Sequence, residues 1–449
     1  METKKKGFPV AFWVCACSEI FERLAYYLGR SLILIFVTAS VATGGLGLSD
    51  TVAANMQSNL TAFSYLLPLF GAVIVDKYIG ARYTTPVGMF IAAAGYFTGG
   101  IAKSSAGVYA MIFLVSLGLA LFKNGAIIGR VITDKSQMDP AFSMRYTLVN
   151  VGAFIGTFLV GILYKDVFAK DGVLGFAPCF KMAALMMVLG GLWYIFVCWR
   201  FLGDLGKLPF KKTLTEEEKA VEAKKKEEAG TKQPLTTIEK KRIGAIFVAS
   251  LFSIVFWIFW YLGYMPVYFY WAENMDWVVA GYQVPSTWFD AANSLFCVIL
   301  GPVTAALWKK LAARPQGDMS LFRKTGLGIA IIGVGYLFYA AIDIMRGGEK
   351  ASVLWLIVFA FLLTMGEMFF SPLGHSFISK YSPSRYLAVM MSVWGFATFI
   401  AAKSYGPVYG LLFGGKIEFK VACIGVAVVS FAAALIMIAL DKTLSALVD

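Results

Sequence analysis

Four charged side chains and a phenol lie within a segment that is otherwise apolar and long enough to cross a lipid bilayer. These residues of the segment 10–41 are Glu19, Glu22, Arg23, Tyr26 and Arg30. All except Glu22 follow one face of a helix, at about 100° per residue. A charge near the bilayer centre costs several kcal/mol, so such residues normally face a protein interior or a wet cavity. Carboxylates and guanidiniums beside a phenol can hold a charged solute and exchange a proton, and we interpret this helix as part of a transport pathway.

The composition indicates a membrane protein with many spans. Hydrophobic residues make up 59% of the 449 residues and charged residues only 15%, which excludes the soluble globular class. The net charge of +13 does not indicate nucleic acid, because the lysines and arginines collect in alternate loops, as the positive-inside rule describes. Anionic lipid headgroups are the expected partners of these loops.

Twelve segments are long and apolar enough to be predicted as membrane-spanning helices. They cover residues 8–40, 49–76, 80–102, 105–133, 141–165, 176–202, 243–272, 285–310, 320–345, 351–380, 385–414 and 417–441. Residues 204–242 are rich in Glu and Lys and nearly devoid of large apolar side chains, so we expect a solvated linker there. The prediction is an all-α membrane protein of two six-helix bundles, 1–203 and 243–449, the plan of the major facilitator superfamily.

The distribution of basic residues also predicts the orientation. An even number of spans puts both termini on one side, and the lysine-rich start and the linker share that side, which is therefore expected to be cytoplasmic. We expect a multi-pass protein of the inner or plasma membrane. The apolar start is too long and too charged for a cleaved signal peptide, so we interpret it as an uncleaved first span.

Redox and metal chemistry are not indicated. The six cysteines fall in or beside apolar segments without a Cys-x-x-Cys pair or a Cys/His cluster, and we interpret them as buried thiols. No nucleophile–base pair or metal ligand set is apparent in the sequence. We therefore expect neither an enzyme nor a cofactor.

Short motifs occur along the whole chain. In the first span, Glu19-x-x-Glu22-Arg23 is followed by Tyr26 and Tyr27. Further motifs follow in this order: 65–71 with Asp76, Gly80 and Arg82; Lys123-Asn124; Tyr146, Asn150 and 152–154; 285–289 with Asn293; 366–374; and 390–394. Together these motifs resemble the signature of the proton-dependent oligopeptide transporters, a family within the major facilitator superfamily, and the resemblance covers nearly the whole chain.

The chain also departs from this family in three places. Span seven of the family typically carries an acidic residue after a Phe-Trp pair, whereas Phe256-Trp257 is followed by no carboxylate before Glu273. The proline that often follows the lysine of span four is absent after Lys123. Bacterial members often insert two helices between the halves, where this chain has only the polar linker.

The resemblance implies how a proton is coupled to transport. Glu19, Glu22 and Arg23 are expected to form a mixed cluster with Lys123, and Glu367 is a further candidate. Protonation of one carboxylate would weaken the cluster and free the lysine. The alternative is a structural ion pair that joins two helices.

The resemblance also implies a binding site for a zwitterion. Arg30 and Lys123 are candidates for a substrate carboxylate and Glu367 for a substrate amine, although Glu367 could instead be a partner of Lys403. Tyr26, Tyr27, Tyr65, Asn150 and Asn293 are the candidate hydrogen-bonding residues of the cavity. The candidate cavity walls are Trp257, Trp260, Tyr261 and Trp394.

Four charged residues are candidates for gates. Asp290 could replace the missing acid of span seven as the partner of Arg30 in an outer gate, or it could cap its helix. Lys403 could neutralise Glu367, bind an anionic group or extend outward to the lipid surface. Asp76 and Arg82 are expected to make contacts between helices at the cytoplasmic ends.

Taken together, these features predict proton-coupled symport of di- and tripeptides by a monomer that works by alternating access. The same fold could carry another small solute, such as an amino acid, a modified peptide or an organic anion, with altered or absent proton coupling. A nutrient sensor that binds without transporting is a third hypothesis.

Overall fold

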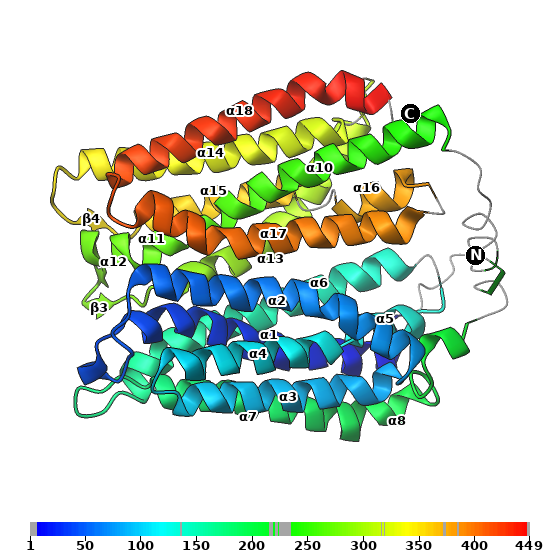
Figure 1. Cartoon of the computed structure of the whole chain (residues 1–449), viewed down its shortest axis with the longest axis horizontal. Helices are drawn as coiled ribbons and strands as arrows, with labels where there is room; N and C mark the ends of the chain where they lie inside the picture. Colours follow the sequence, from blue (N-terminus) through cyan, green and yellow to red (C-terminus); the bar gives the residue numbers. More distant parts are fainter. Residues whose placement is uncertain are drawn as a thin grey trace. The chain divides into compact units, whose positions relative to one another are not determined.

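The structure is a computed structural model. It describes residues 7–134, 137–214, 219–220, 223, 235–315, 317, 319–370, 374–383 and 386–446, without the side chains of residues 139, 375, 376, 379, 380 and 388. Residues 215–218, 221–222 and 224–234 of the predicted linker therefore lie outside the described residues, as do the motif residues Ser371, Pro372 and Leu373, and Arg385. Helices dominate the described part (Figure 1).

Within the described residues, eight helices are long and apolar enough to cross a membrane. They are Asp50–Lys77, Ser105–Val131, Pro140–Val167, Phe176–Leu202, Thr237–Asn274, Trp288–Ala312, Leu321–Met345 and Phe419–Ala446, and Trp355–Phe370 is a shorter apolar helix. The chain is thus an integral membrane protein. Each of the twelve predicted ranges overlaps a described helix, while the count of twelve spans stays a prediction.

The chain divides into two compact units. The first unit comprises Met1–Leu48 and Leu66–Leu214, and the second comprises Ser49–Tyr65 and Thr215–Asp449. Helix α2 (Asp50–Lys77) therefore contributes its first part to the second unit and its last part to the first. The predicted division into 1–203, 204–242 and 243–449 assigned all of this helix to the first bundle, and that division stays a prediction.

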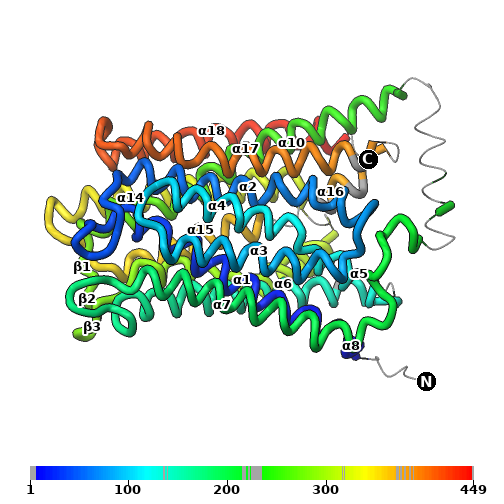
Figure 2. The backbone as a smooth tube through the Cα atoms, turned by 60° about the horizontal axis from the view of Figure 1, so that its bottom comes forward, coloured from blue at the N-terminus to red at the C-terminus, as the bar shows by residue number. Residues whose placement is uncertain are grey.

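In the first unit, α1 packs against α6 and α7, and α3 packs against α4 and α7 (Figure 2). The α-helices are α1 (Val10–Thr38), α3 (Ala81–Ile101), α4 (Ser105–Leu121), α5 (Asn124–Val131), α6 (Met138–Ile162), α7 (Phe176–Trp193) and α8 (Trp199–Leu202). The 3-10 helices are η1 (Val41–Thr43) and η5 (Phe210–Lys212), and the π-helices are η3 (Leu163–Val167) and η4 (Tyr194–Cys198).

Glycines set the closest approach in this unit. A Cβ added to Gly88 of α3 would lie 2.4 Å from the carbonyl oxygen of Gly118 in α4, and a Cβ on Gly118 would lie 2.4 Å from the oxygen of Gly88. Only residues without side chains allow the two backbones to meet this closely, as is common between helices in membranes.

In the second unit, α14 packs against α15 and α18, α10 against α17, and α13 against α15. The helices are α10 (Thr237–Leu262), α11 (Met265–Tyr268), α12 (Tyr270–Asn274), α13 (Trp288–Ala312), α14 (Leu321–Met345), α15 (Trp355–Phe370), α16 (Gly374–Tyr381), α17 (Leu387–Phe413) and α18 (Phe419–Ala446). Four two-residue strands lie in the loops: β1 (Met275–Asp276) pairs in parallel with β4 (Ala351–Ser352), and β2 (Val278–Val279) pairs antiparallel with β3 (Tyr282–Gln283).

Local sequence explains where two of these helices start. The Thr236 hydroxyl accepts a hydrogen bond from the backbone N–H of Glu239, and the Glu239 carboxylate accepts one from the N–H of Thr236, so a capping box begins α10. The Ser320 hydroxyl accepts from the N–H of Arg323 at the start of α14. The capping box starts α10 before residue 243, where the apolar pattern alone placed the start of the span.

Candidate functional site

The charged motif of α1 is buried in the first unit. Glu22 is only 1% exposed, and both of its carboxylate oxygens accept hydrogen bonds from the guanidinium of Arg23. The same guanidinium lies 4.9 Å from the ring centroid of Tyr26. Arg23 therefore balances the charge of Glu22 within the helix itself and adds a cation–π contact.

Glu19 has different partners. Its oxygen Oε1 accepts a hydrogen bond from Nε of Arg145 in α6 at 2.8 Å and another from Nδ2 of Asn124 in α5 at 3.0 Å. The side chain is 1% exposed. Glu19 thus links α1 to two other helices through one of its two oxygens.

The hydrogen bonds described for Lys123 are made to neutral oxygen atoms. Its ammonium donates to the backbone carbonyl of Pro68 in α2 at 2.7 Å, and its backbone N–H donates to the Thr85 hydroxyl at 3.3 Å. The basic partner of Glu19 in this structure is Arg145, and the expected cluster of Glu19, Glu22 and Arg23 with Lys123 stays a prediction. Lys123 precedes α5 at the break after α4, and its side chain extends from there to α2.

The predicted substrate-binding residues of the first unit lie on two helices: Arg30, Tyr26 and Tyr27 on α1, and Asn150 on α6. Arg30 and Tyr26 are 5% and 6% exposed, and the Tyr26 and Tyr27 rings meet edge to face at 5.3 Å. The Asn150 side chain is 9% exposed and donates to the carbonyl of Tyr146 in its own helix at 3.0 Å. The substrate contacts predicted for these residues stay predictions.

In the second unit, Glu367 of α15 is surrounded by neutral polar groups. Its oxygen Oε2 accepts from Nδ2 of Asn293 at 3.4 Å and lies 3.8 Å from Sγ of Cys297, both in α13. Asn293 also donates to the Thr364 hydroxyl at 2.8 Å. Among the described residues, the hydrogen-bond partners of this carboxylate carry no positive charge.

Lys403 and Glu367 have different hydrogen-bond partners. Its ammonium donates to the Asn59 side-chain oxygen in the first part of α2, and the Ser58 hydroxyl donates to the carbonyl of Ala402 at 2.7 Å. The structure therefore does not bring Lys403 to Glu367, and their pairing stays a prediction. The two side chains project from different helices, and α17 directs the lysine toward α2.

Aromatic residues surround the span-seven position where the family carries an acid. Trp257 meets Trp260 at 5.4 Å and Tyr261 at 5.9 Å between ring centroids. The Tyr261 hydroxyl donates to that of Tyr65 at 3.1 Å, and its ring stacks on Tyr405 at 5.0 Å. Aromatic rings and hydroxyl groups therefore occupy the part of span seven where the resemblance led us to expect a carboxylate.

Asp290 in α13 is 5% exposed and accepts a hydrogen bond from the Tyr268 hydroxyl at 2.8 Å. This partner belongs to the same unit, in α11. The helix begins at Trp288, so Asp290 lies in its first turn, where a carboxylate is favourable toward the helix dipole. Its pairing with Arg30 in an outer gate stays a prediction.

Arg82 makes the expected contact between helices. Its guanidinium donates to the carbonyls of Trp199, at 3.0 Å, and of Gly203, and it lies 5.2 Å from the Trp199 ring centroid. Arg82 thereby binds the carboxyl-terminal carbonyls of α8, where a cation is favourable. Asp76 is half-buried in the last turn of α2, and its gate role stays a prediction.

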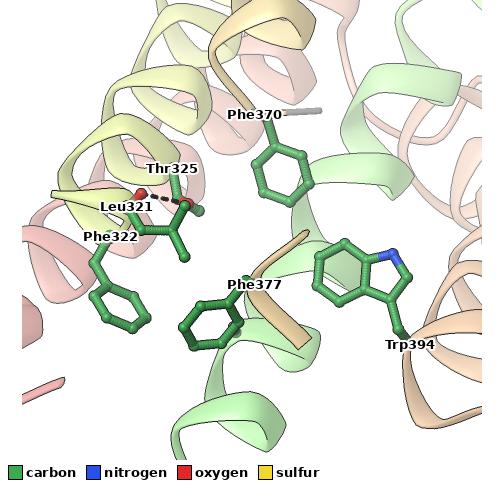
Figure 3. Close-up of a pocket in the computed structure, with 7 residues that line it drawn as sticks. Leu321, Phe322, Thr325, Phe370, Phe377 and Trp394 are labelled. Atoms are coloured by element: carbon green, nitrogen blue, oxygen red, sulfur yellow. Dashed lines mark hydrogen bonds between the residues drawn. The ribbon is translucent and has the colours of Figure 1, made fainter. Parts of the chain in front are cut away.

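A small apolar cavity of about 10 Å³ lies in the second unit between α10, α14 and the residues around α16 and α17. Figure 3 shows the rings of Phe322, Phe370, Phe377 and Trp394 around it, with the Thr325 hydroxyl bonded to the Leu321 carbonyl. Its volume is that of about one water molecule. It is therefore too small for a peptide, and Trp394 here contributes to packing.

Sequence reasoning missed several polar partners of the candidate residues. Asn124 stood only as a neighbour of Lys123, and Arg145 was not among the candidate site residues. Asn59 and Thr364 were not singled out at all. A signal existed for Asn124, because it is a polar residue inside a span at the position where the family often has proline.

Comparisons with known proteins agree with this architecture. Residues 205–413 match the family model PTR2, described as the POT family. The chain is 24% identical to the peptide transporter YePEPT of Yersinia enterocolitica, with 92% of this chain and 88% of the relative covered. It is 23% identical to a di-/tripeptide transporter of Lactococcus lactis, with 86% of each covered. The structure of a POT family transporter in complex with 5-aminolevulinic acid superimposes with a TM-score of 0.85, at 23% identity and 98% coverage of both chains.

Proposed function

We propose that this chain is a member of the POT family, which its residues 205–413 match, and that it is a secondary active transporter that carries short peptides together with protons by alternating access. Di- and tripeptides are the expected cargo. The protein would act as a monomer in a bilayer and would perform no covalent chemistry on its cargo.

One observation carries this proposal: the Glu367 carboxylate is half-buried beside the neutral partners Asn293 and Cys297. A buried carboxylate is strongly destabilised unless a cation or several donors compensate it. The ammonium of a peptide would supply that cation. Lys403, the basic residue that could have neutralised Glu367, instead binds Asn59.

The first unit supplies the charges that a peptide carboxylate and a proton require. Arg30 is 5% exposed, and the Lys123 ammonium donates to a neutral acceptor, the backbone carbonyl of Pro68. We propose that these two cations bind the substrate carboxylate. Glu19, Glu22 and Arg23 would carry the proton switch, because a change of charge on either carboxylate alters its bond to an arginine.

The test is concentrative uptake of a labelled dipeptide into proteoliposomes, with and without an inward proton gradient. The wild type should accumulate the dipeptide only with the gradient, and Glu22→Gln should lose this accumulation. The exposed Glu349 of an outer loop provides the matched control, because Glu349→Gln removes a carboxylate outside the transport machinery. Accumulation by the wild type that is equal with and without the gradient would refute proton coupling.

A second cargo class is favoured by the aromatic residues of span seven. Trp257, Trp260 and Tyr261 fill the position of the family's acid with rings, which suits a smaller or less polar solute. Competition for uptake by dipeptides, single amino acids and organic anions separates the two cargo classes. Inhibition by amino acids or anions without inhibition by dipeptides would favour the second class.

We also propose that both termini face the cytoplasm, on the basis of the basic residues of 204–242. Val41 in η1 and Leu208 after α8 are both exposed and belong to opposite predicted sides. A membrane-impermeant thiol reagent added to intact cells should label Val41→Cys and leave Leu208→Cys unlabelled. The opposite pattern would reverse the orientation.

A further inference from the structure

Two hydrogen-bonded residues from helices far apart in the sequence each have one buried acceptor atom that the described residues do not satisfy. These atoms are Oε2 of Glu19 and Oδ1 of Asn124, for which no hydrogen-bond donor is found among the described residues. The two side chains are 1% and 0% exposed. Buried acceptors without a donor are rare and destabilising, so these two atoms indicate a place where a proton can bind.

The orientation of the Asn124 amide is fixed by its neighbours. Its Nδ2 group donates to the backbone carbonyl of Cys15 at 2.8 Å and to Oε1 of Glu19 at 3.0 Å. A carbonyl oxygen can only accept, so a flipped amide would place its oxygen against two other oxygens. Both hydrogens of the amide are therefore used, and its oxygen remains available as an acceptor.

Protonation would break an existing hydrogen bond at Glu22 but not at Glu19. Both oxygens of Glu22 accept from the Arg23 guanidinium, so a proton there must break an existing bond. Oε1 of Glu19 accepts from Arg145 and Asn124, whereas Oε2 accepts from no described residue. A proton can bind at Oε2 of Glu19 without displacing any of these bonds.

We propose that Asn124 is a positioning residue of proton coupling, which fixes one oxygen of Glu19 together with Arg145 and leaves Oε2 as the oxygen that takes the proton. The charged groups that face Glu19 are Arg145 from α6 and Glu22 from its own helix. Proton binding removes the negative charge opposite Arg145, which weakens the link between α1 and α6. This inference rests on the proposed proton-coupled transport.

The test compares the pH profile of dipeptide uptake for the wild type, Asn124→Ala and Asn124→Asp. Asn124→Ala removes a donor that stabilises the ionised carboxylate, so uptake should persist to a pH about one unit higher. Asn124→Asp places a second carboxylate beside Glu19, and two such groups share a proton, so the profile should move further in the same direction. The matched control is Asn274→Ala, which removes an amide that donates to a backbone carbonyl in α12.

Exchange of labelled for unlabelled dipeptide at equal pH on both sides separates positioning from binding. The Asn124 variants should retain this exchange, because Asn124 is not proposed to touch the peptide. A pH profile of Asn124→Ala and Asn124→Asp equal to that of the wild type would overturn the positioning role. A wild type without proton-driven accumulation would instead refute the proposed function. If Asn124→Ala is not recovered as a folded protein, the isosteric Asn124→Asp decides.

Discussion

Replacement of Arg82 should destabilise the first unit before it affects transport. The guanidinium binds two backbone carbonyls, of Trp199 and Gly203, and lies against the Trp199 ring. The side chain is largely buried, with 8% of the residue exposed. The indole N–H of Trp199 donates in return to the carbonyl of Arg82 at 3.1 Å.

These contacts set the size of the effect. A hydrogen bond from a charged donor contributes about 1.5–3 kcal/mol, and we take the lower value for each of the two bonds. The cation–π contact adds about 0.5–1 kcal/mol. Arg82→Ala should therefore lower the free energy of unfolding by about 3.5–4 kcal/mol. Arg82→Lys keeps the charge but cannot reach both carbonyls in a fork, so about half of this loss is expected.

The assay is equilibrium unfolding in mixed micelles, followed by tryptophan fluorescence, together with uptake measured at a temperature where the variant is folded. The matched control is Lys207→Gln, which removes an exposed cation near α8 that pairs with Asp204. Its effect on stability should be within about 0.5 kcal/mol. An Arg82→Ala protein as stable as the wild type but inactive in transport would refute this reasoning and favour a gate role.

Three further predictions concern the other contacts. Glu367→Gln should weaken dipeptide binding at least about tenfold, and N-acetylation of the dipeptide should have no additional effect in this variant; additive losses would exclude an amine contact. A double-mutant cycle of Asn59→Leu and Lys403→Met, measured by unfolding, should give a coupling energy of about 1 kcal/mol, and zero coupling would contradict their hydrogen bond. Gly118→Ala should lose about 1–3 kcal/mol of stability through its clash with Gly88, and an unchanged unfolding midpoint would show that α3 and α4 separate freely.

The membrane helices were predictable because each depends on a local run of apolar side chains. The ranges predicted for α13 and α14 differ from the observed bounds by a few residues. Interruptions were harder to predict. The predicted span 105–133 is divided after Leu121, next to the polar pair Lys123-Asn124, which was interpreted as part of a family motif and not as a break in the helix.

The candidate site was predictable by residue type and less so by partner. The sequence identified Glu19, Glu367 and Lys403 because charges inside apolar spans are costly. Their partners depend on helix rotation and on residues far away in the chain: Lys403 binds Asn59, 344 residues earlier. Helical periodicity relates residues within one helix and contains no information about which face a distant helix presents.

The π-helical turn Tyr194–Cys198 sets the rotation of the residues that follow it, beginning with α8. Trp193 and Cys198 both donate to the same carbonyl of Val14, at 2.9 Å and 3.3 Å. Five residues apart, they would be separated by about 140° around a regular α-helix, whereas a π-turn brings them onto the same side. Deletion of one residue here would rotate everything downstream, including the Trp199 carbonyl that Arg82 binds. The one additional residue of the π-turn therefore fixes the positions of two contacts at once: the bonds to the Val14 carbonyl and the bond from Arg82 to the Trp199 carbonyl.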